Sequence, residues 1–413
     1  MRALLLLTTL MAGCNLIPTQ ADRRCANLER EVDECLGTTE IPFQCSDLTE
    51  QDIDGLAAII SGLGCAGLAS LLPLDGDPLA ASCAILGESC PPDARPALGS
   101  EAATRHPLVL VNGIDVSPLF SWSDRIVEEL ESGGFDVHLA VVPPYDSTSN
   151  RSRVLWSRIQ EILKESSAAK VNLLCHSLGG LDCRYVASPG GLHWEVDADH
   201  AEILGSLASV TTVATAHHGT PVADIALGLV TNTDSEDAID ALATTLGSWF
   251  TGEALADDVQ LRSAVAALSE SQTLAFNDAV VDAEGLFYQS WGGFSRPFGE
   301  AWPHPEDLAT ACAADEGDGL ALFDGAQDHL SLALAQSFDI IAEAEALSED
   351  GLGPNDGLCP VQSSRWGLFR GCIPADHQEQ LGRGNIPDTN VRTRIDIAKF
   401  YTWVGQDLAQ RGF

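Results

Sequence analysis

The chain has 413 residues, of which 45% are hydrophobic and 20% are charged, so it is long enough to bury a large hydrophobic core. Its formal net charge is −38 at pH 7. A surface this acidic repels phosphate backbones, which excludes nucleic acid from the expected partners.

The first residues have the pattern of an export signal. One arginine precedes an apolar run that is too short to span a membrane, and Ala12, Gly13 and Cys14 follow. Small residues ending at a cysteine resemble a bacterial lipoprotein cleavage site, which predicts a signal peptide over residues 1–13 and a lipid anchor on Cys14. We therefore expect export and anchoring in the outer membrane, a destination that Asn15 favours. Secretion after an ordinary signal peptide is the alternative.

A cysteine-rich segment follows the predicted signal. An even number of closely spaced cysteines in an exported chain predicts a small module held by disulfides, over residues 14–99 including a Pro-rich linker. The spacings lack the paired C-x-x-C of zinc sites, so a metal site is the weaker interpretation. Sequence cannot choose among the possible pairings of these six residues: Cys25, Cys35, Cys45, Cys65, Cys83 and Cys90.

The remaining chain, residues 100–413, alternates short apolar runs with helical patterns. This alternation predicts an α/β fold, with a mainly parallel sheet covered by helices on both faces. Ligands bind such sheets at the carboxyl ends of the strands. The predicted strands are residues 107–111, 135–142, 171–175 and 206–215, and the predicted helices are residues 123–132, 152–166 and 178–187.

Ser177 lies where the strand over residues 171–175 gives way to a helix, in the sequence C-H-S-L-G-G. A sharp strand-to-helix turn of this kind, usually G-x-S-x-G, exposes a serine nucleophile above the sheet. Gly179 fits the second glycine position, whereas Cys175 replaces the first. A chance serine after a strand is the competing interpretation of this short pattern.

Two later residues could complete a catalytic triad. Hydrolases of this kind carry the order Ser, Asp or Glu, then His, and Asp356 and His377 follow Ser177 in that order. An Asp beside a glycine is otherwise a common turn residue, and His377 could be an ordinary loop histidine. Order and spacing together favour the triad.

An oxyanion hole needs two backbone N–H groups near the serine. The residue after the nucleophile, Leu178, would supply one of them. Ile114, which follows the strand over residues 107–111 and the flexible Gly113, would supply the other.

These motifs give the chain a definite resemblance. The sequences VNLLCHSLGGLDCRYV (171–186), SVTTVATAHHGTPVAD (209–224), YQSWGG (288–293) and PNDGLCPVQSSRWG (354–367) resemble those of the secreted bacterial triacylglycerol lipases, over about residues 105–405. The resemblance implies the α/β-hydrolase fold and the nucleophile, acid and base roles of Ser177, Asp356 and His377. Asn112 and Ala216 depart from the family's histidine and proline.

The same resemblance implies two further features. A structural calcium ion would be bound by Asp328 and Glu379, although Arg383 replaces a family glutamine nearby, and no cofactor is expected for the chemistry itself. A mobile lid is expected over residues 235–250, where Ile239, Leu242, Leu246, Trp249 and Phe250 have nearly helical spacing. A folding chaperone is a possible partner.

The cysteines of the hydrolase region give weaker predictions. Cys175 and Cys183 are expected to be buried and inert. A disulfide between Cys359 and Cys372 would close the loop between acid and base, and Cys312–Cys359 competes because the family's own bridge ends near Cys359.

Taken together, the sequence predicts a serine carboxylester hydrolase that acts on acylglycerols or related lipid esters. Two alternatives stay open. One is an acyltransferase or phospholipase that uses the same triad. The other is an inactive surface lipoprotein that binds through its cysteine-rich module.

Overall fold

The computed structural model describes residues 103–117, 120–230, 235–246, 251–297, 302, 305–316, 328, 330–346, 353–383, 389–390 and 395–413. The predicted signal peptide, Cys14 and the predicted cysteine-rich module lie outside the described residues, as do Trp249 and Phe250 of the predicted lid.

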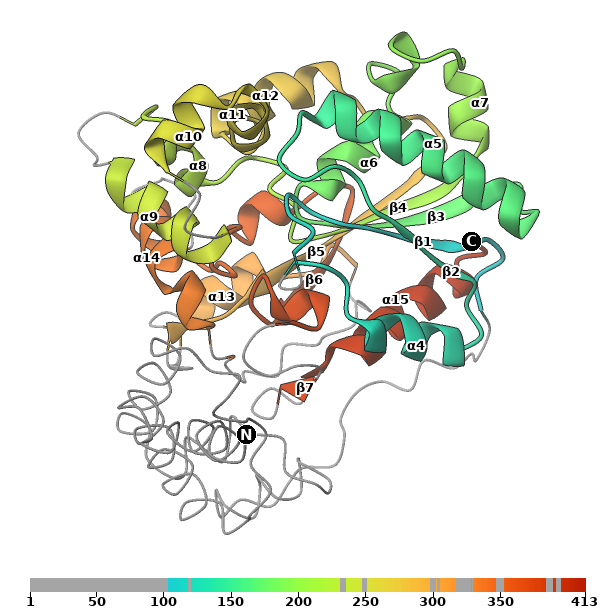
Figure 1. Ribbon diagram of the computed structural model, residues 1–413. Coiled ribbons are helices and arrows are strands. Elements are labelled where there is room, and N and C mark those ends of the chain that lie inside the picture. The colour runs from blue at the N-terminus through green and yellow to red at the C-terminus, as the bar shows by residue number, and fades with distance from the viewer. Residues whose placement is uncertain are drawn as a thin grey trace, which may run out of the picture. The chain divides into compact units, whose positions relative to one another are not determined.

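Strands and helices alternate along the described chain (Figure 1). The strands are β1 (Leu108–Val111), β2 (Val137–Ala140), β3 (Val171–His176), β4 (Leu207–Val213), β5 (Phe287–Phe294), β6 (Leu368–Pro374), β7 (Thr389–Asn390) and β8 (Ile395–Asp396). The helices are α4 (Asp124–Ser132), α5 (Thr148–Ser166), α6 (Gly179–Ala187), α7 (His200–Gly205), α8 (Pro221–Ala226), α9 (Ser235–Leu246), α10 (Gly252–Asp257), α11 (Val259–Ala266), α12 (Glu270–Ala279), α13 (Pro305–Ala311), α14 (Ala335–Ala346) and α15 (Ile397–Gln410). Short 3-10 turns are η2 (Leu192–Trp194), η4 (Leu332–Leu334), η5 (Gln362–Ser364) and η6 (Glu379–Leu381).

One parallel sheet organises the described residues, with the strand order β2-β1-β3-β4-β5-β6. The first four of these strands in chain order (β1, β2, β3 and β4) are those that the sequence predicts, and β5 contains the YQSWGG motif. This topology confirms the predicted α/β-hydrolase architecture. Strand β3 lies in the interior of the sheet between β1 and β4, so its carboxyl end is surrounded by other strand ends.

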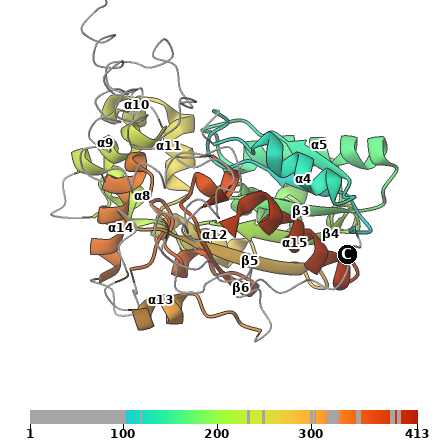
Figure 2. The same cartoon turned by 90° about the horizontal axis from the view of Figure 1, so that it is seen from below.

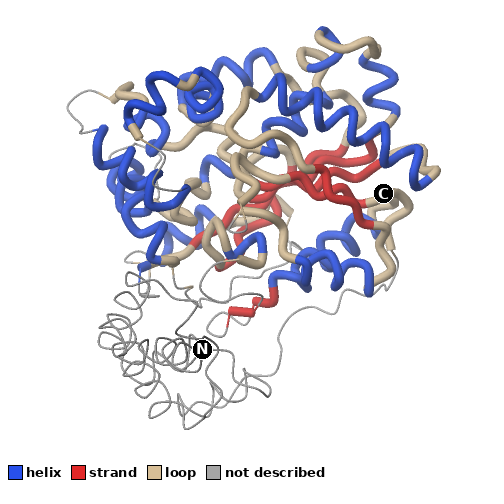
Figure 3. The backbone as a smooth tube through the Cα atoms, viewed as in Figure 1, coloured by secondary structure: helices blue, strands red, loops and turns tan. Residues whose placement is uncertain are grey.

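Alternating side chains of the strands face two different cores. In β1, Leu108 and Leu110 belong to a core that also contains residues of α4 and α15, whereas Val109 and Val111 pack with residues of α5 and α6. Helices therefore cover both faces of the sheet, as Figure 3 shows, with α4 and α15 on one side and α5 and α6 on the other. Continuous apolar runs in the strands follow from burial on both faces.

Side-chain caps set where several helices begin. Ser123 caps α4 by accepting a hydrogen bond from the Ile126 amide, which confirms the predicted start to within a residue. Ser147 caps α5 in the same way, so this helix begins four residues before the predicted position 152. The apolar periodicity missed the extra turn because its residues are polar.

Helices α8, α9, α10, α11 and α14 gather at the end of the sheet opposite the C-terminus (Figures 1 and 2). Helix α9 falls within the predicted lid segment, and it packs against α8 and α14. Among the described helices, none is both long and apolar enough to cross a membrane.

The disulfides differ from the predicted ones. Among the described residues, Cys312 pairs with Cys372 and Cys175 pairs with Cys183. Both predicted pairings that involve Cys359 are therefore wrong, because Cys372 faces the end of α13 rather than the loop of Cys359. The prediction that Cys175 and Cys183 are buried is confirmed, but they are not inert single thiols.

Candidate active site

Ser177 stands at a sharp turn between β3 and α6. Its φ of 55° lies in the left-handed region that few residues other than glycine adopt. A side chain on Gly179 would place a Cβ 2.5 Å from the carbonyl oxygen of Asn112, so the helix start and the β1 loop nearly touch. These features are those of a nucleophile elbow.

The structure brings the three predicted triad residues together. The Ser177 hydroxyl lies 2.9 Å from Nε2 of His377, and Nδ1 of His377 lies 2.8 Å from Oδ2 of Asp356. All three side chains are buried, with 7% exposure for Ser177 and less for the other two. The three groups form a continuous hydrogen-bonded chain from a hydroxyl to a carboxylate.

The Asp356 carboxylate receives more than the histidine hydrogen bond. Its Oδ1 accepts from the backbone amides of Leu358 (3.0 Å) and Cys359 (2.7 Å). Its Oδ2 also accepts from Nε2 of Gln380 at 3.0 Å. Several donors that converge on one buried carboxylate fix its orientation.

Gln380 is a site residue that sequence reasoning missed. It is completely buried, and its backbone carbonyl accepts a hydrogen bond from the Tyr401 hydroxyl at 2.8 Å. Its position three residues after His377 on a 3-10 turn points its amide back at Asp356. No motif in the sequence marks this contact.

His176 precedes the elbow serine and packs beneath the triad. Its ring lies 4.6 Å from the His377 ring and 6.2 Å from the Trp122 ring, between centroids. Burial, followed by the neighbouring His377, lowers the pKa of His176 well below its usual value. His176 therefore stays neutral, and adds no positive charge beside His377.

The loop after β1 runs beside Ser177, as the sequence predicts. A Cβ on Gly113 would lie 2.8 Å from the Ser177 Cβ, so only glycine fits there. The next residue, Ile114, lines the same cavity as Ser177 and His377. No backbone hydrogen bond between described residues uses the N–H of Ile114 or of Leu178.

A buried ion pair that no sequence motif marks supports this loop. Arg151 of α5 and Asp182 of α6 lie 2.8 Å apart, and neither side chain is exposed. Arg151 also donates to the carbonyl oxygens of Gly113 at 2.7 Å and Asn112 at 3.2 Å. Burial raises the pKa of Asp182 to about 6, and the Arg151 guanidinium opposes this shift.

An apolar cavity of about 50 Å³ opens onto Ser177 and His377. Leu242 and Leu246 of α9 form part of its wall. The lining is otherwise almost entirely aliphatic, and includes Ala214, Ala216, Val222, Val265 and Leu268. Helix α9 thus covers the serine in this structure, which agrees with the lid expected over residues 235–250.

Asp328 and Glu379, the predicted calcium ligands, also lie together. Burial and then the proximity of Asp328 and Asp376 raise the pKa of Glu379 well above its usual value. Asp376 is held by the backbone amides of Ser331, Gln378 and Glu379. Two buried carboxyl groups suit a hard cation, but within the described residues no cluster of three or more Asp, Glu, His or Cys side chains is arranged to bind a metal. Calcium therefore stays a prediction.

The comparisons with known proteins point to one kind of enzyme. No family model matches the chain. The chain is 28% identical over 298 residues to the triacylglycerol lipase of Pseudarthrobacter phenanthrenivorans, covering 64% of this chain and 85% of the relative. It is also 28% identical over 298 residues to the triacylglycerol lipase of Burkholderia plantarii, covering 64% of this chain and 75% of the relative.

Solved structures give weaker similarity. Lipase 1 of Pelosinus fermentans is 16% identical, with a TM-score of 0.48 over 74% of this chain and 99% of that one. The mature Bacillus licheniformis lipase BlEst2 is also 16% identical, with a TM-score of 0.45 over 75% of this chain and 96% of that one. The resemblance to bacterial triacylglycerol lipases that the motifs predict, and with it the expectation of an enzyme of the lipase and carboxylesterase type, is confirmed by the curated relatives.

Proposed function

We propose that the protein hydrolyses lipid esters through a serine nucleophile, with Ser177, His377 and Asp356 as nucleophile, base and orienting acid. The observation that supports this most strongly is the hydrogen-bonded chain from the Ser177 hydroxyl through His377 to Asp356. A serine hydroxyl is a poor nucleophile unless an adjacent base removes its proton. Here that base and the acid that orients it come from loops about two hundred residues further along the chain.

In the proposed reaction, Oγ of Ser177 attacks the ester carbonyl carbon while Nε2 of His377 takes the hydroxyl proton. The carbonyl oxygen becomes an oxyanion, which the N–H groups of Ile114 and Leu178 would stabilise. Collapse of this intermediate expels the alcohol, which takes the proton from His377, and leaves an acyl group on Ser177. Water, deprotonated by His377, then releases the carboxylic acid and restores the serine.

The substrate class follows from the cavity and the relatives. An aliphatic lining beside Ser177 suits the hydrocarbon chain of an acyl group, and the described lining residues include no Asp, Glu, Lys or Arg that could pair with a charged substrate. The relatives are named triacylglycerol lipases. Because the cavity of about 50 Å³ is far smaller than an ordinary ligand pocket, we infer that α9 moves aside when a long acyl chain binds.

The test is labelling and turnover on the full chain. A fluorophosphonate should modify Ser177 in the parent protein and not in Ser177→Ala. On p-nitrophenyl esters of increasing chain length, the parent should be active and Ser177→Ala should lose at least about 10³-fold in kcat. A folded parent protein that is neither labelled nor active would contradict the proposal and favour an inactive binding protein. Product analysis with an alcohol acceptor separates hydrolysis from acyl transfer.

Three predictions about the wider chain remain proposals. They are the division into residues 1–13, 14–99 and 100–413, the lipid anchor on Cys14 with its membrane attachment, and a folding chaperone. A fourth is structural calcium at Asp328 and Glu379, which EDTA should test: chelation should lower the thermal midpoint of the parent more than that of Asp328→Asn. Equal midpoints of the parent with and without EDTA would argue against the ion.

A further inference from the structure

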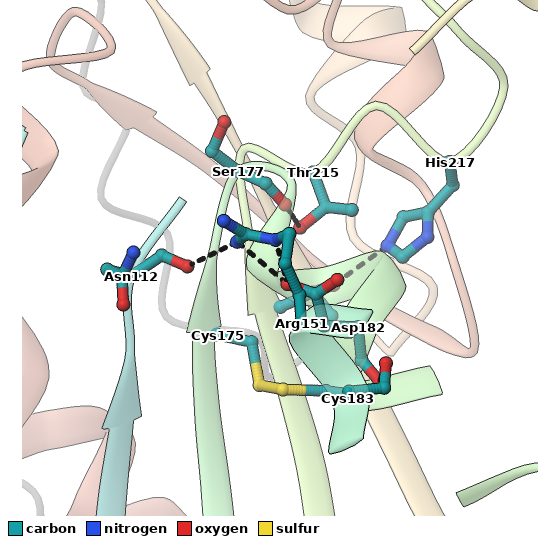
Figure 4. Close-up of a disulfide and its surroundings, with 10 residues drawn as sticks. Asn112, Arg151, Cys175, Ser177, Asp182, Cys183, Thr215 and His217 are labelled. Carbon is teal, nitrogen blue, oxygen red and sulfur yellow. Dashed lines mark hydrogen bonds and ion pairs between the residues drawn. A yellow bond between two sulfur atoms is a disulfide. The ribbon is translucent and has the colours of Figure 1, made fainter. Parts of the chain in front are cut away.

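The nucleophile elbow of this chain is bridged by a disulfide. Cys175 lies in β3 and Cys183 in α6, both are completely buried, and their Cα atoms are 6.7 Å apart (Figure 4). The bond closes a loop of sequence separation 8 that contains both Ser177 and Leu178. The proposed nucleophile and one proposed oxyanion donor therefore lie on a short covalent ring.

The bond explains how the elbow tolerates Cys175. The first position of the usual G-x-S-x-G is small because strand and helix nearly touch there. At the start of α6, side chains on Gly179 and Gly180 would collide with Asn112 and Thr215, so contact with these residues fixes that end of the helix. The disulfide fixes the helix one turn further along. The Cys175 side chain thus occupies the space between β3 and α6 as part of the bond that joins them.

The helix position matters for the other half of the oxyanion site. Asp182, the neighbour of Cys183, accepts a hydrogen bond from Arg151, which also donates to the carbonyl oxygen of Asn112 (Figure 4). The same guanidinium donates to the carbonyl oxygen of Gly113. Gly113 packs against Ser177 and precedes Ile114. A movement of α6 away from β3 would therefore shift Leu178 directly and Ile114 through Asp182 and Arg151.

We propose that the Cys175–Cys183 disulfide is a positioning link for the reaction at Ser177. It holds α6 against β3 and so keeps the N–H groups of Leu178 and Ile114 at the spacing that the oxyanion needs. This proposal rests on the proposed function, since it concerns the same serine. Small displacements of oxyanion donors lower the rate of the chemical step more than they weaken substrate binding.

The experiment compares two double variants of the full chain. Cys175→Ala/Cys183→Ala removes the elbow bond. Cys312→Ala/Cys372→Ala removes the other described disulfide. This bond joins the residue after α13 to β6, five residues before His377, and has a sequence separation of 60. Loop entropy alone predicts that the second variant loses more thermal stability, because the longer loop restricts the unfolded chain more. We expect the opposite order for catalysis. In the elbow variant, kcat should be at least about 10-fold lower than in the parent, with a similar KM. In the Cys312→Ala/Cys372→Ala variant, kcat should stay within about 3-fold of the parent.

Several results would overturn the proposal. One is a folded elbow variant with the kcat of the parent, and another is a loss of kcat no larger than that of the control variant. If the elbow variant does not fold, Cys175→Val/Cys183→Ala refills the volume with aliphatic atoms and repeats the test, with the same loss of kcat expected. Failure of the proposed function can be told apart from these results, because in that case the fluorophosphonate would not label Ser177 in the parent protein either.

Discussion

The two halves of the candidate active site are held in different ways. On the nucleophile side, Ser177 is fixed by a left-handed backbone turn, close glycine packing, a buried ion pair and a disulfide. On the acid–base side, Asp356 and His377 stand on loops and are fixed by hydrogen bonds from backbone amides and from Gln380. Changes on the nucleophile side should therefore lower the stability of the fold and distort the site at the same time. Changes on the acid–base side should lower the rate with less loss of stability.

The largest effect is expected on the acid–base side. Asp356→Asn keeps the shape of the side chain but can no longer hold His377 in the tautomer that accepts the serine proton. By analogy with other serine triads, kcat should fall about 10⁴-fold with KM nearly unchanged. Steady-state kinetics and urea unfolding of the same preparation measure both quantities. If kcat of Asp356→Asn fell only in proportion to the fraction of folded protein, the acid–base side would not differ from the nucleophile side.

On the nucleophile side, Asp182→Asn should act through stability. It leaves the fully buried Arg151 charge without its carboxylate, which destabilises proteins by about 3–5 kcal/mol. Glu161→Gln is a matched control, because it breaks an ion pair to Arg158 whose acidic side chain is 61% exposed and should change stability by less than about 1 kcal/mol. Equal unfolding midpoints for the two variants would show that the buried pair does not hold this half together.

Gln380 allows a charge test of the acid–base side. Gln380→Glu places a second carboxylate beside Asp356, and repulsion between the two like charges should lower kcat about 10-fold near neutral pH. Gln380→Met removes the hydrogen bonds to Asp356 and to the Ala375 carbonyl without adding charge, and should lower kcat only about 3-fold. The pH profile of kcat separates the two variants, because only Gln380→Glu adds a titrating group beside Asp356 and should change the shape of that profile. Superimposable profiles would assign Gln380 to packing alone.

The smallest effect concerns the pH dependence of stability. The pKa of His176 is lowered in the folded protein, so below about pH 6.5 the unfolded chain binds the extra proton and folding becomes less favourable as pH falls. His176→Phe removes this contribution. Between pH 6.5 and 5.5 the parent should lose about 1 kcal/mol more free energy of unfolding than the variant. Denaturant titrations at the two pH values measure this, and parallel losses would mean that His176 does not titrate on unfolding.

The sequence predicted what depends on local pattern and chain order. Apolar runs located β1 to β4, the small residues around Ser177 located the elbow, and the order of Asp356 and His377 located their partners. Contacts between distant segments carry no such pattern. Arg151, Asp182 and Gln380 are ordinary polar residues on helices or turns, and only the fold brings them to the site. Cys175 and Cys183 were misjudged because pairing depends on how α6 packs on β3, which spacing alone does not reveal.

The most direct test is to trap the acyl-enzyme. The full chain is mixed with a p-nitrophenyl ester, quenched in acid within the first turnover, digested, and its Ser177 peptide is weighed by mass spectrometry. We expect an acyl group on Ser177, in an amount that matches the burst of p-nitrophenol. The acyl group should accumulate more slowly in Asp356→Asn. Active protein with an unmodified Ser177 peptide, or with the acyl group on another residue, would contradict the proposed mechanism.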